Sequence, residues 1–135
     1  MRAAAAVALM LAATACAPGE QAASALAARG DREFASAIAG RVAGPPQRCI
    51  NPVNTGGPQL IAPDRLVYRD ASTVWVTRAE GCPFIGRDEV VIAEVFGGQL
   101  CRNDRFRTIQ RGASAGIPGP YCRYGDFTPY RRPAR

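Results

Sequence analysis

The sequence predicts a small all-β domain, a sandwich or a partly open barrel, that is cross-linked by disulfides and follows an export signal and a short tether. Three observations predict this class: short apolar runs between turn-forming residues, four cysteines from residue 49 onward, and an apolar amino-terminal segment. The 135 residues leave room for one domain. We expect a signal peptide over residues 1–15, a partly helical tether over 16–46, the β domain over 47–132 and a tail over 133–135.

The amino terminus is typical of an exported protein. One arginine precedes the apolar run Ala3–Ala13, which is too short to span a membrane and is followed by small residues. The Ala-Thr-Ala-Cys run ending at Cys16 fits an ordinary cleavage site and also resembles a bacterial lipobox, although Ala13 stands where leucine is usual. Five cysteines leave one unpaired, and lipid on Cys16 would account for it. We therefore expect a lipoprotein that faces the periplasm and touches the membrane only through its lipid, or else a secreted or periplasmic protein.

The tether is rich in alanine, which favours helix. Glu20–Arg29 predicts a helix that ends at Gly30, because glycine is favoured just past a helix end. Asp31 predicts the cap of a second short helix, on which Phe34 and Ile38 lie one turn apart. We expect a loose spacer as far as Arg29 and a helix docked on the domain after it.

Leu66–Thr77 gives the strongest hairpin signal in the chain. Two β-branched and aromatic runs flank Asp70-Ala71-Ser72, which predicts a three-residue turn. The cross-strand pairs that this turn predicts are Arg69 with Thr73, Tyr68 with Val74, Val67 with Trp75 and Leu66 with Val76. Val67 and Trp75 would then share the second face of the hairpin, where we expect Trp75 to be partly buried.

Further short runs predict the remaining strands. They are Arg48–Ile50, Leu60–Ile61, Val90–Phe96, Gln99–Cys101, Phe106–Ile109 and the extended segment Tyr121–Tyr130. Runs at this spacing predict a small sandwich or a partly open barrel.

The cysteines of the domain predict two disulfides, because the sequence predicts export and a domain of this size has a small core. These cysteines are Cys49, Cys82, Cys101 and Cys122. Spacing alone leaves all three connectivities open. A zinc site is not expected, since the sequence has neither a Cys-x-x-Cys pair nor a histidine.

The lack of histidine also excludes Ser-His and Cys-His catalytic dyads. Gly97 and Gly98 lack the following helix that a phosphate loop needs, so we expect no nucleotide, and we expect no other cofactor.

The cysteine domain resembles a family of small proteobacterial lipoproteins or secreted proteins of unknown function. The resemblance runs from Arg48-Cys49-Ile50 through the hairpin to Cys82-Pro83, and then over Gln99–Asp104 and Cys122–Tyr130. Some members keep only the second and fourth cysteines, which implies a Cys82–Cys122 bridge and leaves Cys49 to pair with Cys101. The family has no established activity, so the resemblance implies no catalytic residues.

Two kinds of candidate site follow from the carboxyl-terminal half. Three arginines, with nearby tyrosines, are candidates for binding an anionic polymer such as lipopolysaccharide. These residues are Arg123, Arg131 and Arg132, with Tyr121, Tyr124 and Tyr130. The competing interpretation is that the tyrosines pack in the core and that the arginines reflect composition, since all 17 basic residues are arginine and the net charge is +6.

The second candidate is a small hydrolase that uses the carboxylates of Asp104 and Asp126. Asp104 lies in Arg-Asn-Asp-Arg, a run that is also typical of a turn. Close approach of the two carboxylates in an open cleft would favour the hydrolase. We expect binding rather than catalysis: a cell-envelope module whose ligand, protein partner and oligomeric state the sequence does not name.

Overall fold

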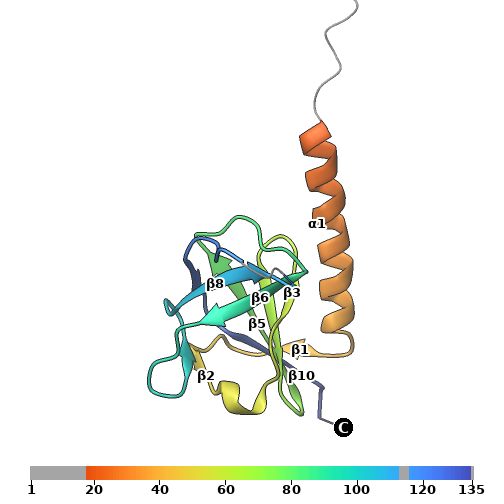
Figure 1. The fold of residues 1–135 in the computed structure, drawn as a ribbon. Helices are drawn as coiled ribbons and strands as arrows, with labels where there is room; N and C mark the ends of the chain where they lie inside the picture. Colours follow the sequence, from red (N-terminus) through yellow and green to blue (C-terminus); the bar gives the residue numbers. More distant parts are fainter. Residues whose placement is uncertain (1–17, 113–115, 135) are drawn as a thin grey trace, which may run out of the picture.

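The computed structural model describes residues 18–112 and 116–134. In chain order its elements are α1 (Pro18–Ala37), β1 (Val42–Ala43), β2 (Cys49–Ile50), the 3-10 turn η1 (Pro52–Asn54), β3 (Gln59–Ile61), β4 (Arg65–Arg69), β5 (Thr73–Glu80), β6 (Glu89–Ala93), β7 (Leu100–Cys101), β8 (Arg105–Gln110), β9 (Cys122–Tyr124) and β10 (Thr128–Arg131). The structure is mostly β with antiparallel sheets, as predicted, and the helix predicted for the tether is a single long one beside the sheet (Figure 1).

The long strand β5 organises the sheet. One of its edges pairs with β4, and the other pairs first with β10 and then with β9. The strand order is β1-β10-β5-β9-β8-β6, with β3 outside β4, and β2 and β7 form a separate two-stranded sheet. All of these pairings are antiparallel. Figure 1 shows β6 and β8 in front of β5, so the sheet folds over its own interior.

Two apolar clusters lie on opposite faces of the β4–β5 hairpin. The larger cluster fills the interior of the folded sheet and contains the rings of Tyr68, Phe106, Tyr124 and Phe127. The smaller cluster lies on the outer face, under α1, and consists of Ala37, Ile61, Val67, Val74 and Val76, with Phe34, Ile38 and Tyr130 packed against it. The docking expected for Phe34 and Ile38 is therefore confirmed.

The hairpin is confirmed, but the register predicted for it is wrong by one residue. Tyr68 pairs with Trp75 and Val67 pairs with Val76. Asp70 N donates to Thr73 O at 2.9 Å, so the turn has two residues, Ala71 and Ser72, and not three. A slip of one residue moves side chains to the opposite face of a strand. Trp75 consequently packs against the larger core, where it is partly buried as expected, and Val67 lies under α1.

The helix break predicted at Gly30 is also wrong, because α1 continues through this residue without interruption. Gly30 is buried, and a Cβ atom at this position would lie 1.9 Å from the carbonyl oxygen of Ala62. The glycine therefore allows the helix to approach the loop before β4, and it does not end the helix. The exposed positions before Leu26 show that the first half of α1 extends past the domain (Figure 1).

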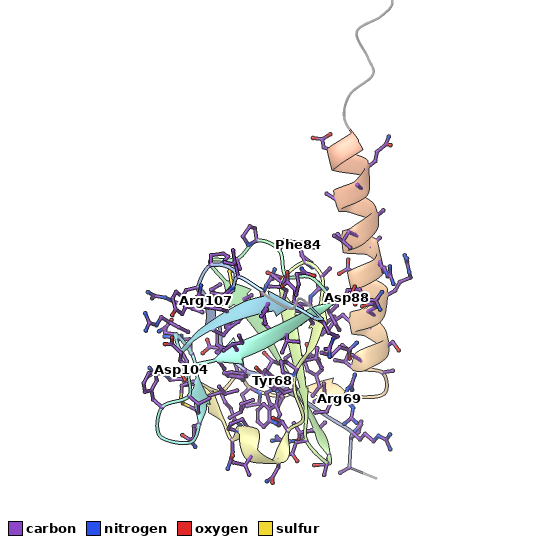
Figure 2. The ribbon with its side chains drawn as sticks, viewed as in Figure 1. Tyr68, Arg69, Phe84, Asp88, Asp104 and Arg107 are labelled. Atoms are coloured by element: carbon purple, nitrogen blue, oxygen red, sulfur yellow. A yellow bond between two sulfur atoms is a disulfide. The ribbon has the colours of Figure 1, made fainter. Side chains whose placement is uncertain are left out.

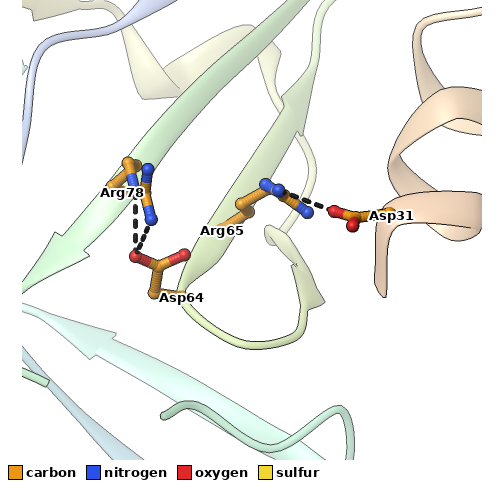
Figure 3. Close-up of polar contacts among 4 residues, drawn as sticks. All are labelled: Asp31, Asp64, Arg65 and Arg78. Atoms are coloured by element: carbon orange, nitrogen blue, oxygen red, sulfur yellow. Dashed lines mark hydrogen bonds and ion pairs between the residues drawn. The ribbon is translucent and has the colours of Figure 1, made fainter. Parts of the chain in front are cut away.

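Polar contacts hold the second half of α1 against the sheet. Asp31 accepts a hydrogen bond from Arg65 at 2.9 Å, and the guanidinium of Arg65 lies 4.8 Å from the ring centroid of Phe34. Figure 3 shows this ion pair beside a second one between Arg78 and Asp64. The Asp31–Arg65 contact crosses from helix to strand, so Asp31 fixes the helix position and does not cap a separate helix.

Both predicted disulfides are present. Cys49 pairs with Cys101 across the β2–β7 ladder, and Cys82 pairs with Cys122. This is the pairing that the family resemblance implies. Cys82 and Cys122 are buried in the larger core, whereas Cys49 and Cys101 are half-buried. Disulfides of this kind are typical of proteins in an oxidising, extracytoplasmic compartment.

The amino-terminal predictions meet the structure only in part. The signal peptide over residues 1–15 and the lipid site Cys16 lie outside the described residues. Val42–Ala43, which we assigned to the tether, belongs to the sheet, because it pairs with β10. Within residues 18–112 and 116–134, no helix has the length and apolar character needed to cross a membrane.

Candidate functional site

A surface hollow of about 390 Å³ is lined by three arginines and the turn of the hairpin. Its lining residues are Arg41, Ala71, Ser72, Arg131 and Arg132. We call this hollow the arginine cavity. It contains two of the three arginines proposed from the sequence as anion ligands, and it adds Arg41.

Strand pairing brings these distant residues together. Arg41 follows the helix end, where Gly40 has a positive φ of 68° and Arg41 N donates to Ile38 O at 3.0 Å. The chain then enters β1, whose Val42 pairs with Arg131 of β10. Arg131 in turn pairs with Thr73, the first residue after the hairpin turn. The end of α1, the end of β10 and the hairpin turn therefore meet at one corner of the domain.

Neutral acceptors hold two of the guanidinium groups. Arg41 Nη1 donates to the carbonyl oxygen of Ser72 at 2.8 Å, and Arg131 Nε donates to Thr73 Oγ1 at 3.2 Å. The guanidinium of Arg131 also lies 5.6 Å from the ring centroid of Trp75, a distance at which a cation is attracted to an indole. These contacts orient the two side chains, and since none of the acceptors is charged, they leave the positive charges uncompensated.

The arginine cavity is lined by three arginines that take part in no ion pair among the described residues. Within residues 18–112 and 116–134, none of its three guanidinium groups has a carboxylate oxygen within 4.0 Å. The carboxylate of Asp70, in the adjacent turn, instead accepts the backbone N–H of Ala71 at 2.6 Å. Elsewhere in the described residues six arginines are ion-paired and six are not, so the cavity is distinguished by having three unpaired arginines in one place. The paired ones are Arg29, Arg65, Arg78, Arg87, Arg102 and Arg105. An anion is the ligand that this unbalanced charge favours.

The structure does not bring Arg123 to the arginine cavity. Arg123 lies on β9 and pairs with Glu80, whereas Arg131 pairs with Thr73 at the other end of β5. Seven residues of extended strand separate these two positions, which corresponds to roughly 23 Å. Arg123 is therefore a separate exposed cation.

The three tyrosines proposed with the arginines also separate. Tyr124 is completely buried, and Tyr130 packs edge-on against Phe34 with ring centroids 6.0 Å apart. Tyr121 is exposed, and the guanidinium groups of Arg105 and Arg107 lie 4.9 and 4.8 Å from its ring centroid. The aromatic residue beside the arginine cavity is instead Trp75.

The two carboxylates proposed for a hydrolase have separate partners. Asp104 Oδ2 accepts the backbone N–H of Cys101 at 2.7 Å, the contact of a local turn. Asp126 pairs with Arg102 at 3.3 Å and lines a different hollow. Asp104 lies on the side of the domain remote from α1 (Figure 2). Neither of the two hollows is lined by both carboxylates.

The second hollow, of about 330 Å³, lies between α1, β5 and β10. Its charged lining residues are Arg65, Arg78, Glu80 and Asp126, and both arginines are already ion-paired. The hollow therefore offers balanced charge and no unoccupied cation. The described residues also contain no group of three or more acidic, cysteine or histidine side chains that could hold a metal ion.

Tyr68 and Tyr124 form a buried hydroxyl pair, with the oxygens 2.8 Å apart. Burial raises the pKa of Tyr124 to about 12 and raises the pKa of Tyr68 still further above its ordinary value. Both rings lie inside the larger core, so the pair affects stability and does not form a site that solvent can reach.

Comparisons with protein families, with curated proteins and with solved structures give no match to this chain. The resemblance to the small proteobacterial lipoproteins therefore stays a prediction. Among the residues of the arginine cavity, Arg41 was missed from the sequence, because it lies far from Arg131 along the chain. The available signal was its position directly after the glycine that ends α1.

Proposed function

We propose that the chain is an exported, non-catalytic binding module of the bacterial cell envelope, and that it binds an anionic envelope component at the arginine cavity. The observation that carries the proposal is that three arginines line one hollow and have no carboxylate partner among the described residues. Arginine binds phosphate and carboxylate groups through paired N–H donors, so the residue type suits an anionic ligand.

The disulfides and the amino-terminal sequence support export. Two bridges are typical of an oxidising compartment, and Cys16 is the cysteine that the bridges leave over. In this proposal residues 1–15 are the signal peptide and Cys16 carries lipid. Labelled palmitate should then enter the wild-type protein but not the Cys16→Ser variant, and equal labelling of both would contradict lipidation.

The shape of the molecule suits a ligand away from the anchor. The amino-terminal end of α1 lies at the opposite end of the molecule from β1 and β10, where the cavity residues meet (Figure 1). A helix of this length spans about 30 Å. An anchor at Cys16 would therefore leave the arginine cavity facing away from the membrane that holds it.

Binding of the full-length protein to purified lipopolysaccharide tests the function. We expect the triple variant Arg41→Gln, Arg131→Gln, Arg132→Gln to bind at least about tenfold more weakly than the wild type, because it loses the donors of the cavity. The matched control is Arg32→Gln, Arg48→Gln, Arg123→Gln, which removes the same charge outside the cavity. An equal loss in both variants would show that net charge alone attracts the ligand.

A further inference from the structure

We infer that the arginine cavity selects a phosphomonoester, a terminal phosphate group with three free oxygens, over a phosphodiester or a carboxylate. The inference rests on the proposed function, since it specifies the ligand of the same site. The chemistry would be shared by a soluble sugar phosphate and by a phosphorylated lipid headgroup.

The first step is the supply of donors. A guanidinium has five N–H donors. Arg131 commits its Nε to Thr73, which leaves both of its terminal amino groups, and Arg41 commits one Nη1 hydrogen to Ser72 O. Arg132 is exposed and also lines the cavity. Two oriented guanidinium groups and the exposed Arg132 beside them therefore offer more donors than one planar acceptor can use.

The second step is the demand for donors. A carboxylate has two oxygens, and one arginine can occupy both through parallel hydrogen bonds. A phosphodiester likewise has two free oxygens and one negative charge. A phosphomonoester has three free oxygens and a charge between about −1.5 and −2 at pH 7. It is the ligand that three arginines match both in number of acceptors and in charge.

The third step is the surroundings of the site. The fixed partners of Arg41 and Arg131 are a carbonyl and a hydroxyl, so the bound anion would meet no competing carboxylate at those contacts. The cavity volume of about 390 Å³ also exceeds what one phosphate fills and falls in the usual range for small-molecule sites. The cavity therefore has space for part of the group that carries the phosphate.

The composition of the chain provides a clean pH test. The chain has no histidine, the side chain that ordinarily changes charge between pH 5 and 8. A phosphomonoester loses its second charge as pH falls through about 6, whereas a phosphodiester does not titrate in this range. A drop in affinity between pH 7.5 and 5.5 would thus report on the ligand and not on the arginines.

The experiment is a titration of the full-length protein with methyl phosphate, dimethyl phosphate and acetate. Binding is measured by calorimetry and by the fluorescence of Trp75, the sole tryptophan. At pH 7.5 we expect methyl phosphate to bind at least about tenfold more tightly than the other two anions. At pH 5.5 its affinity should fall at least about threefold, while that of dimethyl phosphate stays constant. The variant Arg41→Gln, Arg131→Gln, Arg132→Gln should lose the preference.

The outcomes separate the inference from the function on which it rests. Equal affinity for the three anions, abolished in the triple variant, would overturn the phosphomonoester preference and keep anion binding at the cavity. Absent binding, or binding that the triple variant retains, would overturn the proposed function itself. Vesicles with phosphatidic acid, compared with phosphatidylglycerol vesicles, then decide the source, with the Cys16→Ser variant used so that no lipid anchor retains the protein. Retention on the former alone assigns a lipid headgroup, retention on neither assigns a soluble phosphate, and equal retention on both overturns the phosphomonoester preference.

Discussion

The two faces of the β4–β5 hairpin are covered by different means. The inner face packs into a core of aromatic rings, next to the buried Cys82–Cys122 bridge. The outer face is covered by a single helix, which is held by Phe34, by ion pairs such as Asp31–Arg65 and by the close approach at Gly30. Exposed ion pairs contribute little to stability, whereas buried rings and cross-links contribute much.

This difference separates stability from binding. The inner face holds most of the large buried side chains and a covalent bridge, and it offers no site that solvent can reach. The arginine cavity lies at the turn end of the hairpin, where Arg41 follows α1 and where Arg131 contacts Thr73 and Trp75 on the inner side. Changes inside the sheet should therefore alter folding most, changes under the helix should alter it less, and changes to the exposed cavity arginines should alter binding with little effect on folding.

Removal of the inner disulfide should have the largest effect. We expect Cys82→Ala with Cys122→Ala to lower the free energy of unfolding by about 3–5 kcal/mol, because the bridge constrains the unfolded chain and both sulfurs are buried. Urea unfolding, followed by circular dichroism, measures it. The matched variant Cys49→Ala with Cys101→Ala removes the half-buried bridge and should cost less. A larger loss of unfolding free energy in this second variant would contradict the claim that the inner face contributes most of the stability.

High pH should also destabilise the inner face. The folded pKa of Tyr124, about 12, and that of Tyr68 lie above the ordinary tyrosine value of about 10. Their stabilisation is therefore complete below pH 10 and is lost as the pH rises toward the folded values. We expect a loss of roughly 2–3 kcal/mol by pH 11. Urea unfolding at several pH values tests this, and Tyr68→Phe should make the decline less steep.

The outer face should respond to one added methyl group. In Gly30→Ala the new Cβ would meet the carbonyl oxygen of Ala62, so the helix must shift. We expect a loss of about 2 kcal/mol, even though alanine favours helix. Gly19→Ala is the matched control, since its Cβ would meet no atom within 4 Å, and it should be neutral or slightly stabilising. Thermal unfolding compares the two, and equal effects would show that α1 does not depend on contact at Gly30.

The sequence predicts those features of the structure that depend on contacts between residues close together along the chain, and it fails where the contacts join distant residues. The strands and the hairpin turn follow from local patterns. The register of the hairpin does not, because Asp70-Ala71-Ser72 is compatible with two turn lengths and the packing of Trp75 inside the sheet selects one. The local sequence predicts a helix end at Gly30 for a similar reason, because the role of this glycine is set by its distant neighbour Ala62.

The candidate site shows the same limit. Arg131 and Arg132 could be proposed from local charge, but Arg41 joins them only through the β1–β10 pairing. Arg123 looked equivalent to them in sequence, yet it pairs at the opposite end of β5. Long-range strand order, which no local pattern of this chain determines, decides which arginines share a surface.

The smallest effect should come from the exposed ion pair on the outer face. Asp31→Asn removes the contact with Arg65, and because Asp31 is 65% exposed, we expect a loss of at most about 1 kcal/mol. The loss should decrease as salt is added. Thermal unfolding at low and high salt measures it, and a loss that does not depend on salt would mean that Asp31 acts through packing.

The most direct test of the arginine cavity is the salt dependence of binding to inorganic polyphosphate by the full-length protein. Each cation that neutralises a phosphate contributes about 0.7–0.9 to the slope of log Kd against log salt concentration. Arg41→Gln, Arg131→Gln, Arg132→Gln should lower the slope by about 2–3, and the control Arg32→Gln, Arg48→Gln, Arg123→Gln should change it by much less than about 1. Equal changes in the two variants would contradict a selected site and assign the attraction to the arginine-rich composition alone.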